Sequence, residues 1–196
     1  MKRDSAELRT SLFRLGAKQA GYFTAAQALD IGYAYPGQLY HHRRGEWSRV
    51  DRGIYRLAVW PETDHADLVR WTLWSRGHGV VSHETALAVH ELGDVLPAKV
   101  HLLVPRKFRS VDPSVVLHRV DIDADDIEVR AGFRVTTPMR AILDTATDMD
   151  VDRLASVIRD AVDQGVTSAG RLRGRAGQFG PSVAYAIESA LRQLGR

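Results

Sequence analysis

The 196-residue sequence contains no cysteine, and this absence excludes several kinds of protein at once. Without cysteine there is no disulfide framework, no thiolate nucleophile and no cysteine-ligated zinc site. No stretch approaches the roughly 18 apolar residues of a membrane span. The N-terminal Met1-Lys2-Arg3-Asp4 leads into an amphipathic stretch and not into an apolar signal core. We therefore expect a soluble, cytoplasmic protein that does not bind membranes.

Charge is unevenly distributed along a chain of otherwise ordinary composition. Hydrophobic residues make up 44%, enough for a sizeable core, and the length suits one large domain or two small ones. Residues 1–60 carry ten Lys/Arg against five Asp/Glu, whereas residues 61–196 carry 17 against 19. The small net charge of +3 therefore conceals a cationic first part. Contact with nucleic-acid phosphates would use charge placed in this way.

The stretch between Phe23 and Leu57 has the order of elements of a winged helix-turn-helix. Thr24 can cap a short helix that ends near Gly32, because a threonine hydroxyl accepts a free backbone N–H at a helix start. A second helix is predicted over 35–44, since Tyr35-Pro36 places proline in its first turn and Gly45 follows its end. Two β-like runs, 47–50 and 53–57, follow and are joined by a tight turn. An earlier helix over 5–19, capped by Ser5, is expected to pack behind this module.

Hydrogen-bonding side chains on the second helix and the ribbon are the candidate DNA contacts. A recognition helix must offer such groups to base edges or phosphates. Leu39 is expected to anchor the helix to the core. The candidates on the helix are Gln38, Tyr40, His41, His42, Arg43 and Arg44, and those on the ribbon are Arg49, Arg52 and Arg56. Two alternatives stay open: a structural α+β domain with solvated arginines, and a winged helix that docks protein.

Residues 61–196 read as a second, mixed α/β domain. Pro61 suggests the boundary, because proline cannot continue a central strand. Strands are predicted over 97–104, 115–120 and 133–136. Helices are predicted to begin at Thr63 or Asp64, Ser82, Thr137, Val151 and Ser182. The predicted fold class is α+β, with an N-terminal winged helix-turn-helix over 1–60 and a C-terminal mixed α/β domain over 61–196.

Two patterns in this second part suggest metal sites, and neither is convincing. His83 and His90 are seven residues apart, whereas the zinc motif His-Glu-x-x-His needs histidines four apart on one helical face. The aspartates 121, 123, 125 and 126 lack the glycine and distal glutamate of a calcium-binding EF-hand. We expect a structural or interface role for the histidines and a capped turn for the aspartates. The sequence thus predicts no metal and no cofactor.

Basic clusters offer possible partner or phosphate contacts in the second part. They comprise Arg106, Lys107 and Arg109 around Phe108, and the run Arg171, Arg173 and Arg175. Solvated loops are the alternative interpretation of both clusters. No nucleophile–base pair stands out, so we predict no catalytic residues and no enzyme activity.

The order and spacing of several segments resemble the AbiEi antitoxin family of bacterial toxin–antitoxin modules. The segments that carry the resemblance are 23–28, the wing 50–57, Ser82-His83-Glu84-Thr85-Ala86-Leu87-Ala88-Val89-His90-Glu91-Leu92, 100–105 and 133–144. Together they span roughly residues 20–165. The sequence closely resembles the antitoxins of this family that are paired with toxins of nucleotidyltransferase fold.

The resemblance implies two functions. The winged helix would bind operator DNA and repress its own operon, and the second domain would neutralise a toxin similar to AbiEii-type nucleotidyltransferases, which act on tRNA. Palindromic operators usually need two copies of a repressor, so a homodimer on DNA is one arrangement that the sequence leaves open. Similar N-terminal modules also precede endonuclease-like domains. That alternative is poor here, because Glu188 is the only acidic residue after residue 165 and no lysine is present there.

Overall fold

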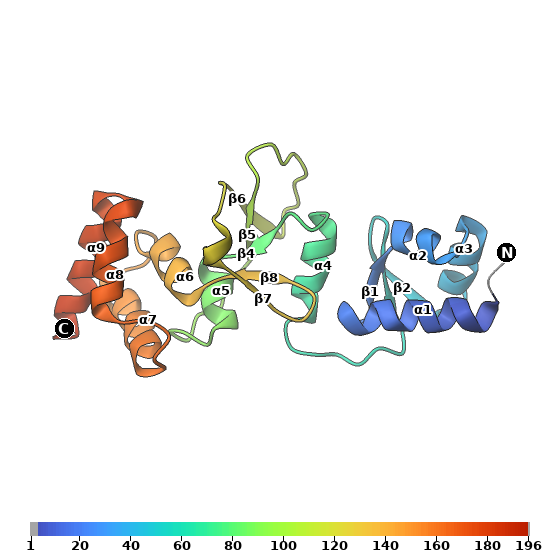
Figure 1. Cartoon of the computed structure of the whole chain (residues 1–196), viewed down its shortest axis with the longest axis horizontal. Helices are drawn as coiled ribbons and strands as arrows, with labels where there is room; N and C mark the ends of the chain where they lie inside the picture. Colours follow the sequence, from blue (N-terminus) through green and yellow to red (C-terminus); the bar gives the residue numbers. More distant parts are fainter. Residues whose placement is uncertain (1–3, 196) are drawn as a thin grey trace. The chain divides into compact units, whose positions relative to one another are not determined.

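The computed structural model describes residues 4–195, which divide into two compact units (Figure 1). The first contains the chain up to Gly79 together with Val129–Phe133, and the second contains Val80–Glu128 and the chain from Arg134 onward. The predicted α+β fold class is confirmed. The functional boundary after residue 60 stays a prediction. The boundary between the two compact units lies instead between Gly79 and Val80. It places α4 (Ala66–Trp74) in the first unit, where the helix packs against β1 and β3.

The first unit has the winged helix-turn-helix order. Its elements are α1 (Ser5–Lys18), β1 (Tyr22–Thr24), α2 (Ala25–Ile31), α3 (Tyr35–Arg43), β2 (Trp47–Asp51), β3 (Ile54–Leu57) and α4. The strands form an antiparallel sheet in the order β1-β3-β2, and the β2–β3 hairpin is the wing. Phe23 is fully buried among helices and sheet, with the Trp47 ring edge-on at 4.8 Å between centroids. This aromatic centre fixes α3 and the wing on one small core.

Local signals explain where the helices of the first unit begin and end. The Thr24 hydroxyl accepts the Gln27 N–H at 3.1 Å, and the Gln27 side chain accepts the Thr24 N–H at 2.8 Å. This reciprocal capping box satisfies two donors that the first turn of α2 would leave free. Gly32 follows α2 with a φ of +123°, which glycine adopts at little cost. The predicted cap of α1 is wrong by one residue, because Asp4 is the N-cap and not Ser5.

The second unit is built on a five-stranded mixed sheet in the order β6-β5-β4-β8-β7. β4 runs antiparallel to β5 and parallel to β8, while β5 and β6 are parallel. The strands are β4 (Val80–Val81), β5 (Val100–Val104), β6 (Val115–Arg119), β7 (Ile127–Val129) and β8 (Arg134–Thr136). A 3-10 turn, η1 (Ala124–Asp126), precedes β7 where a capped turn was expected, but no side chain caps it.

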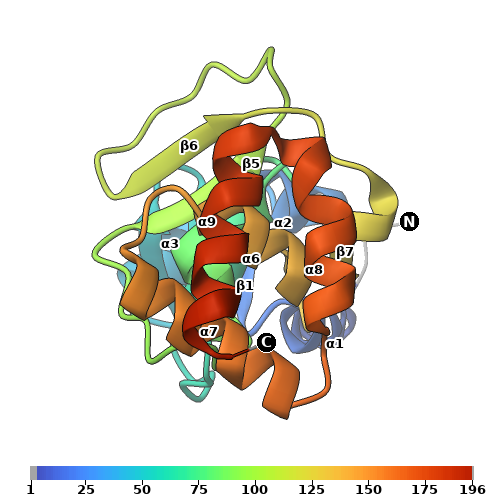
Figure 2. The same ribbon diagram turned by 90° about the vertical axis from the view of Figure 1, so that its left-hand side faces the viewer.

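Helices complete the second unit. They are α5 (His83–Val89), α6 (Pro138–Thr145), α7 (Val151–Asp163), α8 (Ala169–Ala176) and α9 (Pro181–Gln193), with the turn η2 (Gly177–Phe179) between the last two. α8 and α9 lie side by side in Figure 2, and α9 also packs against α7. Leu154, Ile158, Leu172, Ile187 and Leu191 of α7, α8 and α9 are almost completely buried. Within residues 4–195, no helix combines the length and apolarity that a membrane span requires.

Candidate functional site

The exposed face of α3 differs by one residue from the predicted face. Gln38 is only 3% exposed, and its side-chain amide donates to the carbonyls of Ala25 at 3.0 Å and Tyr33 at 2.9 Å. Leu39 is 46% exposed. The predicted roles are therefore reversed: Gln38 anchors α3 to the preceding helix and turn, and Leu39 lies on the surface. Gln38 as a DNA contact is wrong, because its donors are used inside the unit.

His41 and His42 also fasten α3 to the wing. His41 Nδ1 lies 2.6 Å from Glu46 Oε2, and its ring stacks on Trp47 with centroids 4.9 Å apart. His42 Nδ1 lies 3.0 Å from the Trp47 carbonyl oxygen. Both histidines are half-buried. Nδ1 of each ring is therefore engaged within the unit, and a DNA contact by either histidine stays a prediction.

Three predicted contacts on α3 remain at the surface, together with one residue that the sequence analysis missed. Tyr40 is 55% exposed, and Arg43 and Arg44 are exposed as well. Arg44 Nε donates to Glu46 at 2.9 Å and its NH1 to the Tyr40 hydroxyl at 3.2 Å, so its charge is partly neutralised. Tyr35 is 67% exposed on the first turn of the helix. Its position beside Pro36 indicated only where the helix begins, and it did not show that Tyr35 lies at the surface.

The wing presents two of its three predicted arginines. Arg49 and Arg52 are exposed, on β2 and at the hairpin turn. Arg56 instead lies over the Tyr22 ring at 5.3 Å, donates to the Pro61 carbonyl at 2.8 Å and pairs with Glu62. Its guanidinium holds the chain that leaves the wing. Arg56 as a DNA anchor is therefore corrected. Among the described residues of α3 and the wing, Arg43, Arg49 and Arg52 are the arginines without a carboxylate partner, and Arg49 Nε donates to the Asp51 carbonyl at 3.3 Å.

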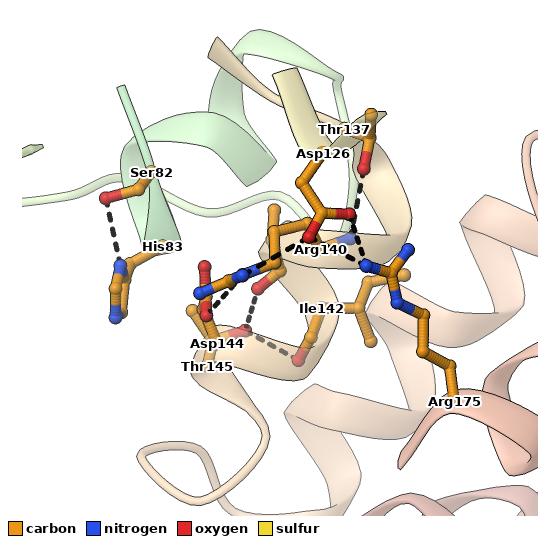
Figure 3. A network of polar contacts seen from close by, with 10 residues as sticks. Ser82, His83, Asp126, Thr137, Arg140, Ile142, Asp144, Thr145 and Arg175 are labelled. Carbon is orange, nitrogen blue, oxygen red and sulfur yellow. Dashed lines mark hydrogen bonds and ion pairs between the residues drawn. The ribbon is translucent and has the colours of Figure 1, made fainter. Parts of the chain in front are cut away.

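The second unit contains a buried charge network that the sequence did not reveal (Figure 3). The Asp126 side chain, 1% exposed, accepts from Arg175 NH2 at 2.7 Å and from Arg140 NH1 at 3.3 Å. Arg140 Nε also donates to Asp144 Oδ1 at 2.8 Å. The network joins η1, α6 and α8. It overturns the loop interpretation of 171–175, because this run is helical and Arg175 is directed to Asp126 instead of an external phosphate.

Burial dominates the electrostatics of Asp144. Its side chain is 7% exposed, and loss of hydration raises the pKa of this carboxyl to about 6, although the neighbouring Arg140 acts to lower it. A group poised in this way can exchange a proton near neutral pH. Here the Asp144 carboxylate and Arg140 form an ion pair within α6. The arrangement is an ion-pair network and a candidate for structural coupling between η1 and α8.

The remaining basic candidates lie at the surface of the second unit. Arg106, Lys107 and Arg109 are exposed between β5 and β6, where Arg106 pairs with the exposed Asp121 at 3.4 Å. Arg173 Nε donates to Glu188 at 2.8 Å, whereas Arg171 lines an open cleft of about 680 Å³. Asp123 and Asp125 line the same cleft, so its charge is mixed. These clusters are not brought together into one basic patch by any contact among the described residues.

The two histidines considered together in the sequence occupy different environments. His90 Nε2 lies 2.7 Å from the Thr136 carbonyl oxygen. His83, at the start of α5, instead meets His101 of β5 and His118 of β6. Burial lowers the pKa of His83 to about 3 and that of His118 to about 4, and it also lowers the pKa of His101. The three imidazoles are therefore neutral at pH 7.

Comparison with known proteins agrees with this architecture. The chain is similar over 97% of its length to the crystal structure of RV2827C protein from Mycobacterium tuberculosis, of which it covers 79%, with a TM-score of 0.59 and 15% identity. At that identity the likeness concerns the fold alone. No curated protein sequence matches the chain. Residues 11–58 match the family model described as "Transcriptional regulator, AbiEi antitoxin", which confirms the resemblance drawn from the sequence. The matched segment lies within the winged helix-turn-helix of the first unit and comprises 48 of the 196 residues, so the likeness to this antitoxin family concerns that part of the chain.

Proposed function

We propose that the protein is an antitoxin that represses its own operon by binding operator DNA through its first unit. The observation that carries the proposal is the joint exposure of Arg43 on α3 and of Arg49 and Arg52 on the wing. In a winged helix these are the two elements that reach a DNA duplex, and arginine is the residue best suited to phosphates and to guanine edges. Tyr35 and Tyr40 add hydroxyl groups on the exposed side of α3.

The second unit is proposed to bind a toxin that resembles AbiEii-type nucleotidyltransferases acting on tRNA. Support comes from the family of the first unit and from the resemblance of segments 82–92, 100–105 and 133–144 to antitoxins of such modules. Exposed cations of this unit, Lys107, Arg109 and Arg171, are available to an acidic partner surface. No catalytic step is part of the proposal.

A salt titration of DNA binding tests the first half of the proposal. The full chain and its variant Arg43→Ala/Arg52→Ala are measured against the promoter fragment upstream of the gene at several salt concentrations. Each lost phosphate contact lowers the slope of log K against log salt by about 0.9, so the double variant should lose about 2. The control is Arg159→Ala, which removes an exposed arginine on α7 of the second unit. It should leave the slope unchanged. Equal slopes for the double variant and the wild type would refute the DNA surface.

A protein-docking winged helix is the second candidate, and one observation favours it. Tyr35 and Leu39, one helical turn apart on α3, are 67% and 46% exposed, and large apolar groups at a surface often mark protein contacts. The discriminating variant is Leu39→Ala. Loss of partner binding without any change in DNA binding would support the docking surface, whereas unchanged partner binding would count against it.

Toxin neutralisation is tested separately in cells. The Arg43→Ala/Arg52→Ala chain is co-expressed with the product of the neighbouring reading frame, and survival is compared with that given by the wild type. Rescue should persist, because the substituted residues lie in the first unit and the proposed toxin surface lies in the second. Loss of rescue by a variant whose circular dichroism is native would contradict this division of labour.

A further inference from the structure

Three histidines from separate segments converge in the second unit. His83 begins α5, His101 lies in β5 and His118 lies in β6. One potential ligand atom of each lies within 4.8 Å of those of the other two. Nothing in the function proposed above uses this cluster.

Strand register explains why these positions meet. β5 and β6 are parallel, with Leu103 beside His118 and His101 beside Val116. His101 and Leu103 share a face because side chains alternate along a strand, so His118 is the diagonal neighbour of His101 on that face. The Ser82 N–H donates to the His101 carbonyl at 3.0 Å, which places the next residue, His83, over the same pair.

The three rings are in direct contact with one another. His101 Nδ1 lies 3.2 Å from His118 Nε2, and the rings of His83 and His118 stack with centroids 3.5 Å apart. Two imidazole nitrogens bound to one tetrahedral zinc ion at its usual bond length lie about 3.3 Å apart. The His101–His118 spacing is close to this value, and a potential ligand nitrogen of His83 lies within 4.8 Å of both.

Ser82 gives His83 the support that a metal ligand needs. The buried Ser82 hydroxyl lies 2.9 Å from His83 Nδ1, which leaves Nε2 of that ring for an ion. A hydrogen bond to the non-coordinating nitrogen is the usual means of fixing the orientation and tautomer of a ligand histidine. His83 itself is 8% exposed and has a φ of +51°. A side chain with a Cβ adopts this left-handed conformation at a cost, and such strain collects at functional positions.

The surroundings leave the site accessible and place charges of both signs near it. His101 and His118 are half-buried, so an ion held by them can exchange with solvent. The carboxylates of Glu84 and Asp148 are close enough to His101 to affect it electrostatically, and Asp148 also acts on His118. Arg140 is the opposing positive charge and acts on His83.

We propose that His83, His101 and His118 form a binding site for a divalent transition metal ion, with zinc as the best fit. Imidazole ligands suit zinc, copper, iron and nickel, and a neutral three-histidine set leaves a fourth tetrahedral position open. Water or a carboxylate of a bound partner protein can occupy that position. The proposal is independent of DNA binding, which resides in the first unit.

Zinc titration of the chelator-treated, tag-free full chain tests the site. The wild type should take up one equivalent of Zn²⁺ and melt at a higher temperature with it, and Co²⁺ should give the visible absorption of a tetrahedral nitrogen-ligated ion. His101→Gln and His118→Gln should each weaken Zn²⁺ binding by about 100-fold, and Ser82→Ala by about 10-fold. His78→Gln, an exposed histidine of the first unit, is the matched control and should bind as the wild type does.

Two results would overturn the proposal. One is the absence of stoichiometric Zn²⁺ uptake by the wild type. The other is equal uptake by wild type and by His101→Gln/His118→Gln, which would place the ion elsewhere. Both residues are half-buried, and a far-ultraviolet melt of each metal-free variant shows whether the fold is intact. Where the double variant does not fold, Ser82→Ala takes its place: Zn²⁺ affinity equal to that of the wild type would then count against the site.

Discussion

Removal of the Arg140 guanidinium is the sharpest test of what stabilises the second unit. Arg140 lies between two buried carboxylates: its side chain is 12% exposed, that of Asp126 1% and that of Asp144 7%. Breaking a buried ion pair costs about 3–5 kcal/mol, because the remaining charge stays uncompensated. Asp126 would keep Arg175, and Asp144 can take up a proton since its pKa is already about 6. We therefore expect Arg140→Met to cost about 3 kcal/mol, at the lower end of this range.

Comparison of this loss of stability with that caused by Arg175→Met makes the test specific. Arg175 is 30% exposed and contacts the same Asp126, which would retain Arg140 when Arg175 is changed. Arg175→Met should therefore cost less, about 1–2 kcal/mol, as expected for one partly solvated charged hydrogen bond. Methionine keeps much of the apolar packing of an arginine side chain and removes its charge. The difference in stability between the two variants therefore reports on the ion pairs.

Two optical signals separate the units in urea denaturation. All four tryptophans, 47, 60, 71 and 74, belong to the first unit. Their fluorescence therefore follows that unit, while far-ultraviolet circular dichroism follows both. Arg140→Met should shift the dichroism transition of the second unit to lower urea at an unchanged m-value. If Arg140→Met costs no more than Arg175→Met, the account of Arg140 as the centre of the network is refuted.

Further predictions concern the anchor of α3 and the protonation of Asp144. Gln38→Ala should lower the stability of the first unit by about 1–3 kcal/mol, because two buried carbonyls lose their donor, whereas Leu39→Ala should change it by less than about 0.5 kcal/mol. Tryptophan fluorescence in urea measures both, and similar losses would contradict the observed orientation of α3. Because the pKa of Asp144 is raised in the folded state, the protonated carboxyl contributes stability that is fully present below about pH 4. This contribution is lost as the pH rises through about 6. The Tm of Asp144→Asn relative to wild type should therefore improve from pH 4.5 to 7.5, and a constant difference would contradict the raised pKa.

The sequence predicted those parts of the fold that local chemistry determines. The Thr24 cap, the end of α2 at Gly32 and proline in the first turn of α3 are confirmed, because each depends on residues within one helical turn. The predicted strands are confirmed with ends that differ by a few residues, such as β5 over Val100–Val104 within the predicted 97–104, whereas the short strands β1, β4 and β7 were not predicted. The helix α8 was missed. Its dense arginines and two glycines resemble a loop, whereas the Ser168 hydroxyl caps it and Leu172 buries one face.

The orientation of α3 could not be predicted from composition. Its residues do not divide into one apolar and one polar face, so a rule that buries leucine and exposes glutamine fails. Gln38 is buried because its amide reaches the carbonyls of Ala25 and Tyr33, which would otherwise lack these donors. That advantage depends on where the chain before α3 runs, and this is a property of the tertiary structure.

The sites of the second unit were beyond sequence reasoning for a related reason. Asp126 and Arg175 are separated by 49 residues and become neighbours only when α8 packs. His83, His101 and His118 meet through the pairing of β4, β5 and β6, and a change of register by one residue would turn a histidine to the opposite face. Spacing along the chain suggested His90 as the companion of His83, because helical periodicity is the only proximity that a single sequence displays.

The structure also changes what the arginines imply for DNA affinity. Only a cation that is free before binding releases counterions from DNA when it binds. Arg44 is paired with Glu46 and Arg56 with Glu62, which leaves Arg43, Arg49 and Arg52. Three such contacts correspond to a salt slope of about −2.7 for one copy and about −5.4 for two. One copy alone would bind operator DNA weakly, so a measured slope near −5 would indicate that two copies bind together. A slope well beyond that value would require cations that the described surface of α3 and the wing does not offer.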